Sequence, residues 1–172
     1  MEKVRRTPAK LSALVAACGL EVLYRSTKYD ETVISVADLN RPALQLVGFF
    51  DYFDEKRLQV LGMAEMQFLQ RMTEHERREV FDRFFTYHIP ALIVARNMGV
   101  FPELLESARK HDRTVLRTGL DTVSVTSQAI DYLNRALAPQ ITRHEDGVLL
   151  LPQAQAVISG GCLTASTARR RS

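Results

Sequence analysis

The sequence predicts an α/β fold in which a largely parallel, layered sheet is flanked by helices. The clearest support is the strand–helix–strand–helix alternation between residues 89 and 137, with short connections throughout. Such alternation is typical of parallel sheets with right-handed crossovers. Residues 90–95 form a nearly unbroken apolar run, which suits a strand buried on both faces of a sheet. At 172 residues and 46% hydrophobic content, the chain is also long enough to build one core.

The first part of the chain is predicted to form a helix and two strands. Thr7 as N-cap, Pro8 at the first helical position and Gly19 at the stop bound a helix over residues 7–19. Two runs rich in β-branched side chains follow, separated by a polar turn. They predict strands at residues 20–24 and 32–36.

The middle of the chain predicts a strand and two helices. The strand covers residues 57–62 and the first helix residues 63–72, where apolar side chains recur at helical spacing. The second helix, over residues 73–85, opens with a capping box formed by Thr73 and Glu76. Its buried face is expected to hold Val80, Phe81, Phe84 and Phe85.

The last regular elements precede Pro139. Proline at the start and basic residues at the end define a helix over residues 102–111. A strand at residues 114–118 and a long helix at residues 121–137 complete the alternation. We therefore predict that residues 1–139 form one α/β domain.

Beyond Pro139 the periodicity weakens, so we expect residues 140–172 to be a separate and poorly ordered segment. Its only strand-like pieces are residues 147–151 and 154–159. Two short strands without a partner sheet bury too little surface to offset the entropy lost when they become ordered.

Composition narrows the classes of partner. The net charge of +3 comes from 23 basic and 20 acidic residues, and the three arginines at 169–171 account for all of it. A neutral body argues against a nucleic-acid partner. No apolar run reaches the roughly 18–20 residues that span a membrane. The two cysteines, Cys18 and Cys162, show no CxxC spacing. We therefore expect a cytoplasmic protein in a reducing compartment.

Neither a catalytic residue nor a metal site is predicted. No two of the four histidines lie four residues apart, and the sequence contains no G-x-S-x-G. We interpret the histidines as surface or packing residues: His75, His88, His111 and His144.

Three arginines are candidates for binding an anion. Arg96 and Arg117 each follow a predicted strand, and ligands in open α/β sheets lie beyond the carboxyl ends of strands. Arg41 precedes a proline in a fixed turn and is a candidate anion clamp. The alternative is that Arg96 and Arg117 pair with acidic residues at the surface, and the candidates are Glu103, Glu106 and Asp121.

Four aromatic residues follow this turn within five positions: Phe49, Phe50, Tyr52 and Phe53. One interpretation is an aromatic rim around a planar ligand. The other is a bend at Gly48 that turns the rings into the core, where aromatic side chains bury large areas.

The C-terminal segment nearly matches the phosphate-loop pattern G-x-x-x-x-G-K-[ST]. Gly160 and Gly161 begin the match, while Ala165 replaces the second glycine and Ser166 replaces the lysine. Serine carries no charge to reach a phosphate, and the alanine methyl group obstructs close backbone approach. Only Thr167 retains a side chain that can bind Mg²⁺, so the loop is degenerate.

Six stretches in order resemble the N-terminal domain of the bacterial HPr kinase/phosphorylase family. They are NRPALQLVGFFDYF, RLQVLGMAE, IPALIVARNM, PELLESA, VLRT and YLNRALAP. The resemblance covers residues 7–139, and one departure is Ala43, where the family usually has glycine. It continues more loosely into the degenerate loop.

The resemblance implies a two-domain protein. The N-terminal α/β domain is similar to the uridine-nucleotide-binding domain of Mur ligases and has no established catalytic role. The C-terminal domain is hexameric, uses ATP and Mg²⁺, and phosphorylates and dephosphorylates a serine of the phosphocarrier HPr. Since the chain ends five residues after Thr167, we expect it to have no cofactor of its own and to be inactive alone. Its expected partners are HPr, other HPr kinase subunits or a second copy.

Two other functions stay open. One is a free-standing domain that senses a nucleotide or phosphorylated metabolite. It is also compatible with a subunit whose catalytic half is a separate chain.

Overall fold

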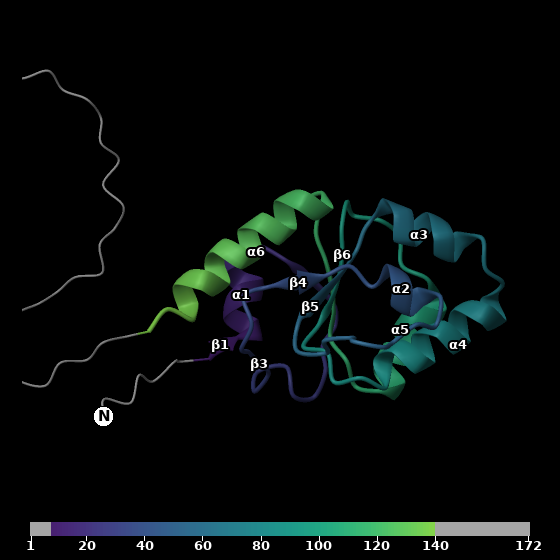
Figure 1. Ribbon diagram of the computed structural model, residues 1–172, viewed down its shortest axis with the longest axis horizontal. Coiled ribbons are helices and arrows are strands. Elements are labelled where there is room, and N and C mark those ends of the chain that lie inside the picture. Colours follow the sequence, from purple (N-terminus) through teal and green to yellow (C-terminus); the bar gives the residue numbers. More distant parts are fainter. Residues whose placement is uncertain (1–7, 140–172) are drawn as a thin grey trace, which may run out of the picture. The chain divides into compact units, whose positions relative to one another are not determined.

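A five-stranded sheet forms the centre of the computed structural model, which describes residues 8–139 (Figure 1). The strand order is β2-β7-β6-β5-β4, and neighbouring strands from β7 to β4 run parallel. Strand β2 runs antiparallel along β7 and forms one edge. The bounds are β2 Glu21–Tyr24, β4 Leu39–Asn40, β5 Leu58–Leu61, β6 Leu92–Val94 and β7 Val115–Arg117. The predicted α/β class with a largely parallel sheet is confirmed.

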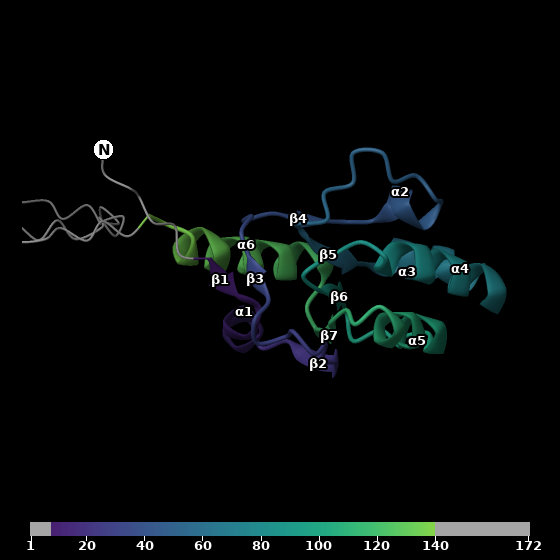
Figure 2. The ribbon, with the colours of Figure 1, turned by 90° about the horizontal axis from the view of Figure 1, so that it is seen from below.

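Helices cover both faces of this sheet (Figure 2). One face packs against α1 and α6, and the other packs against α3, α4 and α5, with the short α2 on the same side. The bounds are α1 Leu11–Cys18, α2 Ala43–Leu46, α3 Met63–Gln70, α4 Glu74–Phe85, α5 Pro102–Lys110 and α6 Thr122–Ala136.

The central strands supply side chains to both layers. Ile93 of β6 lies in the core cluster beneath α1 and α6, whereas its neighbours Leu92 and Val94 lie in the opposite cluster. All residues of β5 and β6 are buried. The apolar run at residues 90–95 therefore reflects a strand covered on both faces, as predicted.

Several predicted helix ends are confirmed. Gly19 follows α1 in the left-handed conformation, with φ of 59°, where glycine carries no steric penalty. The capping box of α4 is present: the Glu76 amide donates to Thr73 Oγ1 at 3.3 Å, and the Thr73 amide donates to Glu76 Oε2 at 2.7 Å.

The predicted start of the first helix is wrong. Helix α1 begins at Leu11, because Ala9–Lys10 form the short strand β1. This strand pairs antiparallel with β3, Val33–Ile34, in a separate two-stranded sheet. Pairing with a distant segment therefore outweighs the local helix-start signal at Pro8, while Thr7 lies outside the described residues.

Two further short elements were not predicted from the sequence. Strand β4 and helix α2 flank the turn at Arg41-Pro42, and each is too short to show a periodic pattern. Between residues 8 and 139, no helix has the length and apolar character required to cross a bilayer. The strand-like pieces predicted after Pro139, and the whole segment 140–172, lie outside the described residues.

Candidate functional site

The carboxyl ends of the four parallel strands meet along one side of the sheet, the usual position of ligands in open α/β folds. All three arginines predicted as anion ligands are found there. Arg41 follows β4, Arg96 lies two residues after β6, and Arg117 is the last residue of β7. We call the region of these arginines and Gly62, which follows β5, the carboxyl edge.

Arg41 is paired with a buried carboxylate at this edge. Its Nε lies 3.0 Å from Glu65 Oε1 and its Nη2 lies 3.0 Å from Glu65 Oε2. The Glu65 side chain is only 4% exposed and also accepts the Gly62 amide at 3.0 Å. The guanidinium of Arg41, about half exposed, is therefore oriented by the first turn of α3 and its charge is largely matched.

Arg117 is paired with Glu21 on the neighbouring strand. Its Nε and Nη2 donate to the two carboxylate oxygens at 2.8 and 3.0 Å. The two residues are direct cross-strand partners in the β2–β7 register. Hydrogen bonding by Arg117 holds the pKa of Glu21 below its usual value.

The carboxylates suggested as partners of Arg96 and Arg117 form other contacts, so that part of the prediction is wrong. Glu103 pairs with Arg77 and Glu106 with Arg78. Asp121 caps α6 by accepting the Ser124 amide at 2.9 Å.

Arg96 differs from the other two arginines. It has a positive φ of 60°, and the next residue, Asn97, has a φ of 49°. Two hydrogen bonds hold this unusual pair: the Arg96 amide donates to Leu120 O and the Asn97 amide to Thr118 O, both at 2.8 Å. The side chain of Arg96 is exposed, and no ion pair joins it to a carboxylate within residues 8–139.

The charge of Arg96 nevertheless acts on the start of α6. Hydrogen bonds from Ser124, with a further contribution from the Arg96 charge, hold the pKa of Asp121 below its usual range. The three predicted arginines thus share one edge, but two of them already have carboxylate partners.

The aromatic stretch divides between core and surface. Phe50 stacks on Tyr87 at 4.9 Å between ring centroids, and Phe53 meets Tyr87 edge-on at 5.1 Å. Phe49 is 46% exposed and Tyr52 fully exposed. Gly48 provides the predicted bend with a φ of +89°. Phe50 and Phe53 thus pack against the core, as one of the two interpretations predicted.

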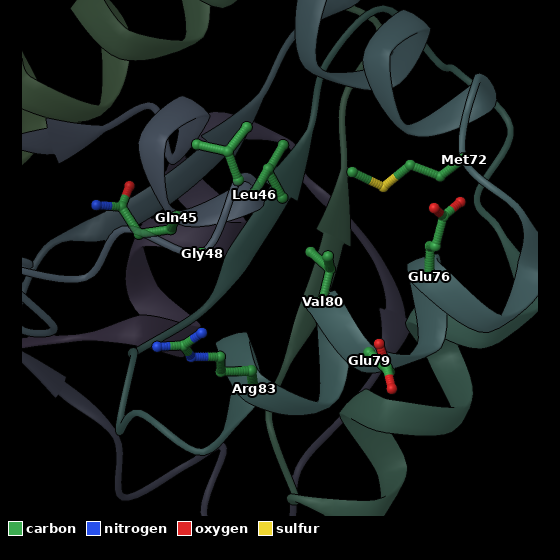
Figure 3. A pocket seen from close by; sticks show the side chains of 9 residues that line it. Gln45, Leu46, Gly48, Met72, Glu76, Glu79, Val80 and Arg83 are labelled. Carbon is green, nitrogen blue, oxygen red and sulfur yellow. The ribbon is translucent and has the colours of Figure 1, made fainter.

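A groove lies between α2 and α4 (Figure 3). Its cavity measures about 310 Å³ and its apolar lining includes Leu46, Met72 and Val80. Figure 3 shows Val80 between Arg83 on one side and Glu76 on the other. We call it the α2–α4 groove. Three side chains in or beside it are markedly exposed: Val47, which lines the groove, at 62%, and Leu44 and Phe49 at 58% and 46%. No sequence pattern indicated the groove, because the four residues of α2 are too few to show helical periodicity.

Residues 9–133 match the protein family described as the HPr serine kinase N terminus. The chain belongs to this family. The resemblance to HPr kinase N-terminal domains, inferred above from the residue patterns, is therefore confirmed.

Similar proteins include the HPr kinase/phosphorylases of several bacteria. The one from Caldicellulosiruptor bescii is 38% identical over 148 residues, covering 82% of this chain and 48% of that relative. The one from Alkaliphilus metalliredigens is 45% identical over 118 residues, covering 69% and 38%. The chain thus spans about half the length of the first of these relatives, and a smaller share of the length of the second.

One solved structure is similar in fold. It is the regulatory region of Clostridium perfringens pyrophosphatase, with CBS and DRTGG domains, complexed with the activator diadenosine tetraphosphate. The TM-score is 0.53 at 15% identity, and the match covers 76% of this chain and 51% of that chain. At this identity the likeness concerns the fold alone.

Within the described range 8–139, no three His, Cys, Asp or Glu residues are grouped so that they can hold a metal ion. The degenerate loop residues Gly160, Gly161, Ala165, Ser166 and Thr167 lie outside that range.

Proposed function

We propose that this chain acts as a regulatory or assembly module of the HPr kinase/phosphorylase type and does not itself transfer phosphate. The observation that carries the proposal is the charge pairing at the carboxyl edge. Arg41 and Arg117, two of the three arginines available to hold a phosphate there, are matched by Glu65 and Glu21. A phosphoryl-transfer site needs unmatched positive charge where negative charge develops.

The degenerate loop supports the same proposal. Ser166 stands where a phosphate loop has its lysine, and that lysine supplies much of the charge stabilisation in phosphoryl transfer. ATP and Mg²⁺, which the family uses, would then be bound by a complete catalytic domain. HPr would be the substrate of that domain, and a cytoplasmic location would follow from this role.

The assembly role is supported by the exposed apolar side chains beside the α2–α4 groove. Leu44, Val47 and Phe49 form a patch of a kind that often marks a protein interface. The groove also carries both charge signs, with Glu79 and Arg83 on its rim. A groove that carries both positive and negative charge suits a twofold pairing in which Arg83 of one copy faces Glu79 of the other. We therefore propose a second copy of the chain as the partner.

The catalytic part of the proposal is tested by incubating the full 172-residue chain with HPr, ATP and Mg²⁺. We expect no phosphoserine on HPr by mass spectrometry, while full-length HPr kinase/phosphorylase from Caldicellulosiruptor bescii, as the positive control, modifies it. ATP-dependent phosphorylation of HPr by this chain alone would show that the proposal is wrong.

The assembly part is tested by light scattering of the full chain and two valine variants. We expect twice the single-chain mass of 19.5 kDa for the parent, and a single-chain mass for Val47→Glu, because a charge in the patch must be desolvated on pairing. Val123→Glu is the matched control, since Val123 is 79% exposed on α6. A monomeric parent chain, or equal masses for parent and Val47→Glu, would contradict the proposed pairing.

Ligand binding at the carboxyl edge is a second candidate function, favoured by the exposed Arg96 without a carboxylate partner in the described range. Arg41 and Arg117 would then exchange part of their carboxylate contacts for a phosphorylated ligand. A rise in melting temperature with ATP that is lost in Arg96→Gln would favour this function.

A further inference from the structure

A small polar pocket lies at the opposite edge of the sheet, where β6 and β7 begin. Its cavity measures about 190 Å³ and is formed by three segments, residues 26–33, 88–90 and 112–114. The first segment arrives there because β2 runs antiparallel to β7, so its carboxyl end meets the beginning of β7 at the Tyr24–Val115 pair. We call this cavity the amino-edge pocket.

Two buried hydroxyl groups in its wall leave one proton without an acceptor. Ser26 Oγ and Thr114 Oγ1 lie 2.9 Å apart, and one of them donates to the other. Thr114 Oγ1 also accepts the Ser26 amide at 3.3 Å. Each hydroxyl carries one proton and their mutual bond uses only one. Whichever hydroxyl donates, the second proton finds no acceptor in the hydrogen bonds of the described residues. The wall therefore offers a donor to whatever occupies the pocket.

The basic side chains of the pocket have no carboxylate partner within residues 8–139. Lys28 and Arg113 both line it, as does His88. The Nε of Arg113 donates to Tyr87 O at 2.9 Å and its Nη1 approaches Asp112 O at 3.4 Å. These acceptors are neutral carbonyls, so Arg113 forms no ion pair with a carboxylate within residues 8–139, although its charge also acts on the neighbouring Asp112.

Asp112 is the one carboxylate in the lining, and its oxygens are already used. It accepts the Thr27 amide at 2.9 Å, the Thr27 hydroxyl, and the Tyr24 hydroxyl at 3.2 Å. These hydrogen bonds, led by those from Thr27, hold the pKa of Asp112 below its usual range. Glu55, which accepts the His88 amide at 2.8 Å, is not part of the lining. Among the lining side chains, the two cations Lys28 and Arg113 exceed the one anion, Asp112, so the pocket favours negative charge.

We propose that the amino-edge pocket binds a small oxyanion, namely a phosphate or carboxylate group. Its oxygen atoms would accept the remaining hydroxyl proton of the Ser26–Thr114 pair and would be balanced by Lys28 and Arg113. The size of the cavity, about 190 Å³, is in the range of cavities that hold a ligand of a few heavy atoms. A free anion or a small anionic metabolite suits it. The proposal is independent of the assembly role and of the carboxyl edge.

The test is an NMR titration of the full ¹⁵N-labelled chain at pH 7. Sodium phosphate and sodium acetate are the probes, and sodium chloride at equal ionic strength is the reference. We expect saturable shifts of the Ser26 and Thr114 amides with phosphate, acetate or both, and none with chloride. The preferred probe distinguishes a phosphate from a carboxylate ligand.

Two charge variants make the assignment specific. Lys28→Gln is expected to weaken binding about fivefold, the upper range for a partly exposed ion pair. Arg71→Gln removes an exposed charge at the end of α3, away from the lining, and is expected to leave the affinity unchanged. Equal weakening in both variants would indicate general charge attraction and would overturn the proposal.

The hydroxyl pair is tested by Ser26→Ala combined with Thr114→Val, for which we expect about tenfold weaker binding. If that double variant does not fold, Ser26→Ala alone leaves the Thr114 hydroxyl proton free to donate and should bind with little change. Shifts identical to those in chloride would mean that water alone fills the pocket, and the proposal would be wrong. Shifts centred on Arg96 and Gly119 would also overturn it and would support the carboxyl edge instead.

Discussion

Replacing Arg77 by methionine is expected to lower the free energy of unfolding by about 3–5 kcal/mol. In a urea titration this corresponds to a fall of about 2 M in the unfolding midpoint, for a slope of about 2 kcal/mol per molar. The expected loss is large because Arg77 neutralises a buried carboxylate.

The partner of Arg77 is Glu103 in the first turn of α5, where the carboxylate side chain is only 4% exposed. Arg77 Nη2 donates to Glu103 Oε1 at 2.9 Å, while Glu103 Oε2 is buried without a partner among the described residues. Arg77 also donates to Met72 O at 2.7 Å and lies 4.7 Å from the ring centroid of Phe101. It therefore connects the end of α3 to the start of α5, and its loss leaves a charge buried without compensation.

Two variants distinguish the loss of this buried ion pair from a general sensitivity of α4 to substitution. Arg78 is the next residue and forms exposed ion pairs with Glu74 and Glu106, so Arg78→Met should leave the midpoint nearly unchanged. Combining Arg77→Met with Glu103→Met replaces the pair by apolar side chains and should recover most of the loss. If the double variant is less stable than Arg77→Met, an unpaired buried charge is not the cause.

The effect of Arg77→Met should also depend on pH. Burial acts to raise the pKa of Glu103, but hydrogen bonding and the charge of Arg77 outweigh it and leave the pKa lowered. The native pair therefore stabilises the fold above the pKa of unfolded glutamate, and this contribution is lost as the pH falls through the lower native value. Without Arg77, the main contributions that oppose burial are removed, and the pKa of Glu103 is expected to rise. The difference in stability between parent and variant should narrow on acidification.

The sequence predicted elements whose signals are local and long enough to repeat. The Thr73–Glu76 capping box and the apolar strand around Ile93 both carry their evidence within a few residues, and both are present. Strand β1 depends instead on pairing with Val33–Ile34, more than twenty positions away. The helix-start pattern at Pro8 contains no trace of that pairing, so the prediction placed the first helix too early.

In the candidate site, too, features with local sequence signals were predicted, and features that depend on distant pairing were not. The strand–helix alternation placed Arg96 and Arg117 at the carboxyl ends of strands. It did not identify Glu21 as the partner of Arg117, because this requires the antiparallel register of β2 against β7. The amino-edge pocket was missed for the same reason, since Ser26 meets Thr114 only through that register.

Gly62→Ala is expected to lower the free energy of unfolding by about 2–3 kcal/mol, measured by urea denaturation. Gly62 lies between β5 and α3 in an ordinary extended conformation, with φ of −103°, so backbone strain is not the cause. A Cβ atom there would lie 2.6 Å from Thr122 Oγ1 and 3.0 Å from Glu65 Oε2. The contact with Thr122 is far too short and the contact with Glu65 is tight, and the buried carboxylate that holds Arg41 has little freedom to move.

Gly99→Ala is the matched control, because a Cβ atom at that position would meet no atom within 4 Å. It should change stability little, or increase it slightly by restricting the unfolded chain. Thr122→Ala removes the nearest obstructing atom, so adding it to Gly62→Ala should recover about half of the loss, with the Glu65 contact accounting for the remainder. If Gly62→Ala costs no more than Gly99→Ala, the edge is loosely packed and Glu65 does not hold Arg41 in a fixed orientation. A large cost that Thr122→Ala partly relieves would mean that close packing between β5, α3 and α6 determines how Arg41 is presented at the carboxyl edge.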